Sequence, residues 1–220
     1  MTGDQPRMLF LIRHGRSDLD SDVMTVTVRG RQWDPPLGEE GRLQAELLGR
    51  RLAMMPPPAA VYCSTFQRAR ETIAPYVSRT GCDVTYLEEL GEAFIGAWEG
   101  MSFEEIVKDD EEMLPLFRNQ EAMWRRAPGA EPLPRLQERA TTAIEAALAH
   151  HPQGDVIVVA HGGIINAYIA PILGLHELEM FFLPDNTSIN TVVVEGDRRS
   201  VRFLSDVRHL HEPHFFDPDA

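Results

Sequence analysis

Residues 9–15 read LFLIRHG and residues 157–163 read IVVAHGG, and these two stretches decide the fold. In each, a run of four apolar residues is followed within two positions by a histidine and then a glycine. A short apolar run of this kind is typical of a strand buried on both faces of a parallel sheet. Ligands bind in the crevice outside the carboxyl ends of such strands, and glycine lets the backbone turn sharply there. We therefore expect His14 and His161 to lie at the same edge of one sheet.

The rest of the chain continues this pattern of strands followed by helices. A third apolar run ends at residues 61–63. Helical spacing of apolar residues is found at 43–52, 65–78, 136–148 and 164–173, and a hairpin pattern is found at 190–204. Such alternation predicts an α/β fold of three layers, α/β/α, with a mostly parallel central sheet. We expect residues 1–220 to form a single domain, with a small helical cap at 101–130 and a tail at 211–220.

Composition limits the possible classes of protein. The 220 residues include 43% hydrophobic and 25% charged side chains, which is the balance of a globular protein with a real core. The net charge is −13, from 34 acidic and 21 basic residues, and it argues against a nucleic-acid partner. No signal-peptide pattern and no apolar run of membrane-spanning length is present, so we expect a cytoplasmic protein without a membrane partner. Cys63 and Cys82 lack metal-like spacing and are expected to be reduced and buried.

Two arginines are expected beside the two histidines. Arg13 directly precedes His14. Arg68 follows the third apolar run closely enough to lie in the first turn of the next helix. Ser64 or Thr65 is expected to cap that helix. Guanidinium groups bind phosphate oxygens well, and helix N-termini also favour anions. The residues at this edge therefore predict a pocket for a dianionic phosphoryl group.

The sequence then resembles a known family along most of its length. The matching motifs are residues 11–15 (LIRHG), 34–41 (DPPLGEEG), 62–69 (YCSTFQRA), 90–92 (LGE), 96–100 (GAWEG) and 158–163 (VVAHGG). In this order they resemble the signature of the histidine phosphatase superfamily, the phosphoglycerate-mutase-like proteins. The resemblance covers residues 8 to 210.

The resemblance implies a role for each matching residue. His14 would attack phosphorus and become a phosphohistidine, while Arg13, Arg68 and His161 would hold the phosphoryl oxygens. Glu92 would protonate the leaving oxygen and later take a proton from water. Spacing alone does not distinguish Glu92 from its competitors, which are Glu88, Glu89 and Glu99. No cofactor and no metal site is implied, and the three tail histidines at 209, 211 and 214 are not expected to bind metal.

Other positions near the pocket depart from the family pattern. Arg16 stands where the family often has Glu, and it is expected either to add a cation at the pocket mouth or to point to solvent. Asp20 stands where Asn is frequent, and we expect it to pair with Arg29 or Arg31. The segment 18–33 is interpreted as an unusually long loop. Further candidates for substrate binding are Ser17 and Gly162. Substrate specificity is expected to depend on the segment 18–33 and on the cap at 101–130, where the resemblance to the family is weakest.

The favoured function is hydrolysis of a small phosphorylated metabolite by a metal-independent phosphatase. The chain is shorter than the mutases of the family and lacks their insertion before residue 128. Two alternatives remain, namely a 2,3-bisphosphoglycerate-dependent phosphoglycerate mutase and a non-catalytic module that binds a phosphorylated ligand. The sequence leaves the oligomeric state open, a homodimer included.

Overall fold

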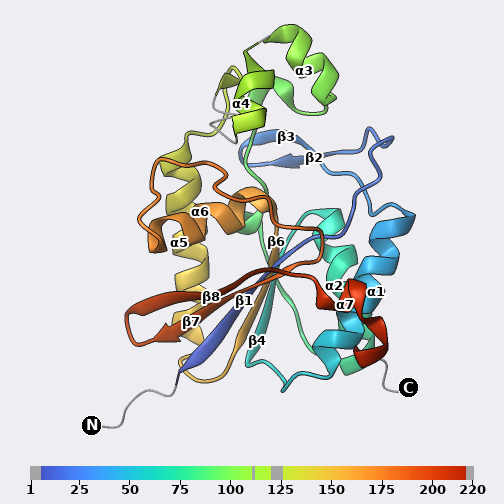
Figure 1. Cartoon of the computed structure of the whole chain (residues 1–220), viewed down its shortest axis with the longest axis vertical. Helices are drawn as coiled ribbons and strands as arrows, with labels where there is room; N and C mark the ends of the chain where they lie inside the picture. The colour runs from blue at the N-terminus through green and yellow to red at the C-terminus, as the bar shows by residue number, and fades with distance from the viewer. Residues whose placement is uncertain (1–5, 111, 120–125, 217–220) are drawn as a thin grey trace.

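The computed structural model describes residues 6–110, 112–119 and 126–216, and a six-stranded sheet lies at its centre (Figure 1). The strands are, in spatial order, β5 (Thr85–Leu87), β4 (Ala60–Ser64), β6 (Val156–Ala160), β1 (Arg7–Arg13), β7 (Ile189–Glu195) and β8 (Arg198–Asp206). The first four run parallel, whereas β7 is antiparallel to β1 and β8 is antiparallel to β7. The predicted α/β fold and the predicted hairpin are confirmed.

Strand β6 shows why the fold has three layers. All five of its residues are buried, and successive side chains point to opposite faces of the sheet. Val156 and Val158 pack in one core, whereas Ile157 and Val159 pack in another. The first core lies against α5 (Leu133–His150) and α6 (Gly162–Ile172), and the second lies against α1 (Glu39–Ala53) and α2 (Gln67–Thr80). A strand covered on both faces needs no polar side, so its sequence is continuously apolar.

The segment predicted as a loop at 18–33 instead contains a hairpin. Its strands are β2 (Met24–Thr27) and β3 (Gly30–Trp33), paired antiparallel across a two-residue turn. Four successive β-branched residues, 25–28, favour an extended backbone here. Gly30 follows the turn with a φ of +131°, a conformation that glycine adopts most easily. The loop prediction was therefore wrong for the second half of the segment.

The predicted cap region at 101–130 contains two short helices, α3 (Phe103–Asp109) and α4 (Met113–Asn119). A capping box between Ser102 and Glu105 begins α3, which explains why the helix starts there. Figure 1 places both helices beyond the edge where β1 and β6 end. Two 3₁₀ turns precede them, η1 (Glu88–Leu90) and η2 (Gly96–Trp98). Residues 111 and 120–125 of the expected cap lie outside the described residues.

The C-terminal segment packs back on the body of the molecule. Helix α7 (Arg208–His211) and the 3₁₀ turn η4 (Pro213–Phe216) both contact α1. Residues 217–220 of the predicted tail lie outside the described residues. Within the described ranges both cysteines are free; Cys63 is buried as expected, but Cys82 is only half-buried. No helix in the described part of the chain is long and apolar enough to cross a bilayer.

Candidate active site

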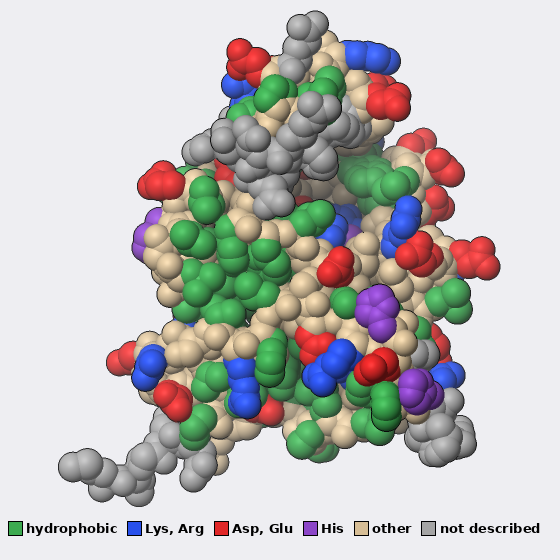
Figure 2. Space-filling model, in the orientation of Figure 1, with side chains coloured by type: hydrophobic (Ala, Val, Ile, Leu, Met, Phe, Trp, Pro, Cys, Tyr) green, Lys and Arg blue, Asp and Glu red, His purple; other side chains and the backbone are tan. Residues whose placement is uncertain are grey.

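The two strand-end histidines lie side by side. Strands β1 and β6 are parallel neighbours, and Arg13 is paired in register with Ala160, so the residues that follow emerge together. The ring centroids of His14 and His161 are 5.1 Å apart, with the rings tilted by 55°. His14 is 7% exposed and His161 is fully buried. Figure 2 shows Lys or Arg and His atoms in a hollow below the uppermost helices. The expected meeting of the two histidines is confirmed.

The His14 ring is held through one of its two nitrogens. Its Nδ1 lies 2.7 Å from the carbonyl oxygen of Gly15, which can only accept, so Nδ1 carries the proton. Burial, and then the positive charges of Arg68 and Arg13, keep the pKa of His14 well below its usual range. The ring is therefore neutral, and Nε2 has a free lone pair. An uncharged imidazole with a free Nε2 is a competent nucleophile.

Arg13 and Arg68 come from two different elements. Arg13 Nη1 donates to the carbonyl of Pro184 at 2.5 Å, while its buried Nε has no partner among the described residues. Arg68 lies in the first turn of α2 as predicted, and it donates through Nη1 to the Trp33 carbonyl at 3.0 Å and to Asp34 Oδ1 at 3.2 Å. Two guanidinium groups therefore border the histidine pair, one of them held by a buried carboxylate.

Asp34 also corrects the predicted cap of α2. Phe66 occupies the N-cap position without a side-chain cap, so neither Ser64 nor Thr65 plays that role. Both carboxylate oxygens of Asp34 accept from the Gln67 N–H instead, at 2.9 and 3.0 Å. Burial raises the pKa of Asp34, although the Gln67 N–H and the charge of the arginine oppose this shift. An acceptor 33 positions away in the sequence thus caps the helix and orients its arginine.

The Ser64 hydroxyl has a different partner from the one expected. It lies 2.9 Å from His161 Nε2 and 3.3 Å from the Phe66 N–H. His161 Nδ1 is buried without a partner among the described residues, as is Arg13 Nε. Buried polar atoms are rarely left unsatisfied in folded proteins. Two such nitrogens at the pocket of His14 are the arrangement expected of a site that receives an anion.

Glu92 faces the same site. Its carboxylate accepts from the Gly163 N–H at 3.0 and 3.3 Å, and from the Ala93 N–H at 2.9 Å. Gly163 lies in the first turn of α6, whose free N–H groups favour an anion. The negative charge of Glu92 is also felt by Arg13 and Arg68, where it raises the pKa of each against the lowering by burial. Glu92 is therefore close to both phosphate-binding candidates.

The competing carboxylates have other partners. Glu88 accepts from the Val28 N–H at 2.6 Å, and Glu99 accepts from Trp33 N at 2.9 Å and Ile95 N at 3.0 Å. Glu89 lines a groove along α5. The carboxylates of Glu88, Glu92 and Glu99 all contact backbone N–H groups. Of the three, it is Glu92 that accepts from the first turn of α6, two residues after His161. Spacing alone had not distinguished them.

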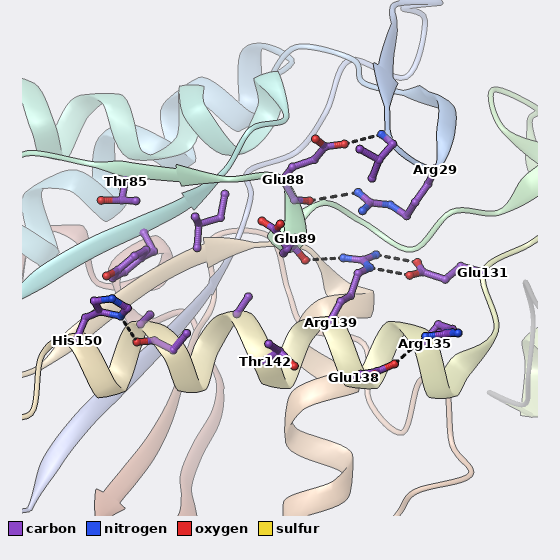
Figure 3. Close-up of a pocket in the computed structure, with 16 residues that line it drawn as sticks. Arg29, Thr85, Glu88, Glu89, Glu131, Arg135, Glu138, Arg139, Thr142 and His150 are labelled. Carbon is purple, nitrogen blue, oxygen red and sulfur yellow. Dashed lines mark hydrogen bonds and ion pairs between the residues drawn. The ribbon is translucent and has the colours of Figure 1, made fainter.

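The same groove, drawn in Figure 3, contains Arg139, which holds the backbone at Glu92. It has a volume of about 950 Å³ and lies along α5, next to the edge strand β5. From α5, Arg139 reaches Glu131 with two ion-pair contacts of 2.7 and 2.8 Å. The same guanidinium donates to the carbonyls of Glu89, Gly91 and Glu92 at 2.6, 2.7 and 3.1 Å. Sequence reasoning missed Arg139, because nothing in its neighbourhood marks it among the other charged residues of the helix.

A chain of hydrogen bonds connects His209, near the C-terminal end of the described residues, to the backbone of His14. Arg51 donates to Nδ1 of the buried His209 at 3.2 Å, so His209 Nε2 carries the proton that is donated to Thr187 Oγ1 at 3.1 Å. Thr187 has a φ of +58°, a strained conformation for a β-branched residue. Its N–H donates to the His14 carbonyl at 3.3 Å, and Asn186 Nδ2 donates to the same oxygen at 3.0 Å. Sequence reasoning assigned no role to these residues.

Three of the four remaining candidates, Arg16, Ser17 and Asp20, lie at the periphery. The Arg16 side chain is 57% exposed and pairs with Glu40 at 3.1 Å, so it points to solvent. Ser17 forms an isolated bridge with the backbone of Leu37. Asp20 is exposed, and no ion pair with an arginine is found for it within the described part of the chain.

The expected partner Arg29 is engaged elsewhere, since its Nε and Nη2 donate to Gln32 Oε1 and to the Glu88 carbonyl at 3.3 and 3.2 Å. Gly162 begins α6, and a Cβ there would lie 3.8 Å from Arg13 Nε, so this residue does border the site. Among the described residues, no group of three His, Cys, Asp or Glu side chains is arranged to hold a metal.

Fold and site together define an α/β protein with a histidine-arginine pocket for an anion, and the comparison with known proteins gives its family. The sequence profile of the histidine phosphatase superfamily (branch 1) matches residues 9–207, so the chain belongs to this superfamily. A metal-independent phosphoserine phosphatase of Arabidopsis thaliana is 28% identical over 220 residues, which cover 96% of this chain and 88% of that protein.

A glucosyl-3-phosphoglycerate phosphatase of Mycobacterium tuberculosis is 31% identical over 180 residues, which cover 77% of this chain and 76% of that protein. Among solved structures, Bacillus stearothermophilus YhfR matches with a TM-score of 0.78 and 28% identity, covering 93% of this chain and 99% of that one. The resemblance expected from the sequence motifs is confirmed.

Proposed function

We propose that this protein hydrolyses a small phosphorylated metabolite through a phosphohistidine on His14. The observation that carries the proposal is the unprotonated Nε2 of His14 at a site with two buried nitrogens, on Arg13 and His161, that have no partner among the described residues. The oxygens of a phosphate monoester dianion would accept hydrogen bonds from these two nitrogens, and its phosphorus atom would be attacked by His14 Nε2. The phosphatase activities named for the relatives from Arabidopsis and Mycobacterium support the same reaction class.

In the first step, His14 Nε2 forms a bond to phosphorus and the bond from phosphorus to the ester oxygen breaks. Glu92, in its protonated form, gives its proton to the departing oxygen. In the second step, water attacks phosphorus, the bond to His14 breaks, and Glu92 takes the proton from the water. Arg13, Arg68 and His161 hold the phosphoryl oxygens throughout, so the charge of the transition state is met by protein groups. This charge compensation supports metal-independent hydrolysis, as does the metal-independent relative.

The direct test measures phosphate release from p-nitrophenyl phosphate in EDTA. We expect release by the wild type and a loss of at least about 10³-fold in His14→Ala. His150→Ala is the matched control, because His150 is exposed at the end of α5 and its Nδ1 lies 2.7 Å from the Ala146 carbonyl one turn earlier in the same helix. Equal activity of His14→Ala and the wild type would refute the proposal.

Glu92 is tested by the choice of leaving group. p-Nitrophenolate leaves readily without a proton, whereas an alkoxide does not, so Glu92→Gln should lose much more activity on an alkyl phosphate than on p-nitrophenyl phosphate. An equal loss on both substrates would contradict the proton-donor role.

Trapping of an acid-labile, base-stable phosphoenzyme separates an enzyme from a non-catalytic binding module. Interconversion of phosphoglycerates that depends on bisphosphoglycerate would identify the mutase alternative instead. A panel of phosphorylated metabolites then ranks substrates by kcat/KM.

A further inference from the structure

Ser64 is the last residue of β4 and is fully buried beside the site. Because β4 and β6 are parallel neighbours, with Cys63 in register with Val159, Ser64 emerges next to the end of β6. Its Oγ is 2.9 Å from Nε2 of His161. The ring of Phe66 packs edge-on against the same imidazole, with centroids 5.1 Å apart, so the ring plane is held as well. The proposed reaction assigns no role to Ser64.

The direction of the hydrogen bond between Ser64 and His161 follows from the other contacts of the hydroxyl. Ser64 Oγ already accepts the Phe66 N–H at 3.3 Å, and its own hydrogen needs an acceptor. Among the described residues, His161 Nε2 is the acceptor that the structure offers. Burial, and then the charge of Arg68, keep the pKa of His161 well below its usual range, so the imidazole is neutral and carries one proton. Ser64 therefore donates to Nε2, and the proton of His161 is on Nδ1.

His161 Nδ1 is the ring nitrogen that has no partner in the part of the chain that the structure describes. With its proton on Nδ1, the ring offers a buried donor beside His14, and Arg13 Nε is a second buried donor without a partner among the described residues. In the opposite tautomer, Nδ1 would present a lone pair to a phosphoryl oxygen, which repels it. One hydroxyl thus decides whether a neutral imidazole attracts or repels the phosphoryl group.

We propose that Ser64 is a positioning residue that holds His161 in the Nδ1–H tautomer, so that this nitrogen donates to a phosphoryl oxygen. The proposal rests on the proposed function for the identity of the anion, but not for the tautomer itself. Three neighbouring strands then each contribute one residue to the site. His14 follows β1 and is the nucleophile, His161 follows β6 and is the hydrogen-bond donor, and Ser64 at the end of β4 determines which nitrogen of His161 carries the proton.

The tautomer is measured directly by two-bond ¹H–¹⁵N correlation spectra of the full chain labelled with ¹⁵N-histidine, with His161 assigned by comparison with His161→Gln. We expect the Nδ1–H pattern in the wild type and a shift toward the Nε2–H pattern in Ser64→Ala. Inorganic phosphate should perturb the His161 Nδ1 signal of the wild type. A wild-type spectrum in the Nε2–H form, or an unchanged tautomer in Ser64→Ala, overturns the proposal.

Ser64→Cys is the matched variant, because it keeps the approximate shape of the side chain but replaces the hydroxyl by a weak donor. If donation matters, Ser64→Cys and Ser64→Ala should both bind inorganic phosphate more weakly and turn over p-nitrophenyl phosphate about tenfold more slowly than the wild type. If only packing matters, Ser64→Cys keeps wild-type phosphate affinity, and the proposal fails. The two proposals can fail separately. If His161 has its proton on Nδ1 and the protein binds phosphate but releases none from p-nitrophenyl phosphate, the proposed hydrolysis is refuted and the role of Ser64 stands.

Discussion

Gly163 offers a sharp test of how closely Glu92 must be placed. Its N–H donates to both carboxylate oxygens of Glu92, and a Cβ at this position would lie 2.4 Å from Oε1 and 3.3 Å from Cδ. Carbon and oxygen atoms prefer to stay more than about 3.2 Å apart, so Gly163→Ala must displace the carboxyl group by roughly 1 Å. The helix cannot yield in its place, because the residues of its first turns are buried against the sheet.

A displacement of about 1 Å at a reacting group costs on the order of 100-fold in rate, which is about 2.7 kcal/mol in activation free energy. We expect that loss in kcat/KM on an alkyl phosphate, and a much smaller loss on p-nitrophenyl phosphate, which needs no proton. Alanine is also the better helix former by about 1 kcal/mol, so a lower helix propensity would not explain the loss.

Gly162→Ala is the matched control for this experiment. The new Cβ would lie 3.6 Å from Met180 Cε and 3.8 Å from Arg13 Nε, which are ordinary contacts, in the same turn of the same helix. Its kcat/KM should stay within about threefold of the wild type, less than 1 kcal/mol in barrier. Wild-type activity of Gly163→Ala, or an equal loss in both variants, would refute the assignment of Glu92 as the group displaced.

Two further predictions concern the supports of the site. Asp34→Asn leaves the buried Arg68 without its counter-charge, so the free energy of unfolding in phosphate-free buffer should fall by about 3 kcal/mol. Added inorganic phosphate should stabilise this variant more than the wild type, and equal stabilisation in urea titrations would contradict the explanation. Burial lowers the pKa of His209 to about 4, so as pH falls from about 6.5 the unfolded state takes up the proton first and stability is lost. Between pH 7 and pH 4, the free energy of unfolding should decrease by about 3 kcal/mol less in His209→Gln than in the wild type. The same decrease in both proteins, measured by urea titration at each pH, would exclude His209 as the cause.

Much of the site was predictable because its residues follow buried strands directly. A continuous apolar run such as 156–160 is readable without a structure, since both faces of a central parallel strand are covered. Parallel neighbours end at one edge, so the pairing of His14 with His161 followed from two local patterns. The position of Arg68 in the first turn of α2 likewise depends only on where the preceding strand ends.

The supports were not predictable, because they connect positions that are far apart in the sequence. Asp34 caps a helix that starts 33 residues later, and Arg139 holds a backbone segment 47 residues earlier through carbonyl oxygens, which every residue has. The segment at 18–33 was interpreted as a loop because its hairpin has only four-residue strands. Short strands depend on what they pack against more than on their own propensity.

The sequence by itself determined three parallel strands and the final hairpin of the sheet, the two histidines at its edge and the nearby arginine, since each depends on the order of residues within one local unit. The family followed from the order of motifs along the chain. Only the tertiary structure decided where the protons lie. The Gly15 carbonyl assigns the proton of His14, and the Ser64 hydroxyl assigns that of His161. The physical reason is that a tautomer is set by the partner of the opposite nitrogen, and that partner comes from whichever element the fold brings within 3 Å.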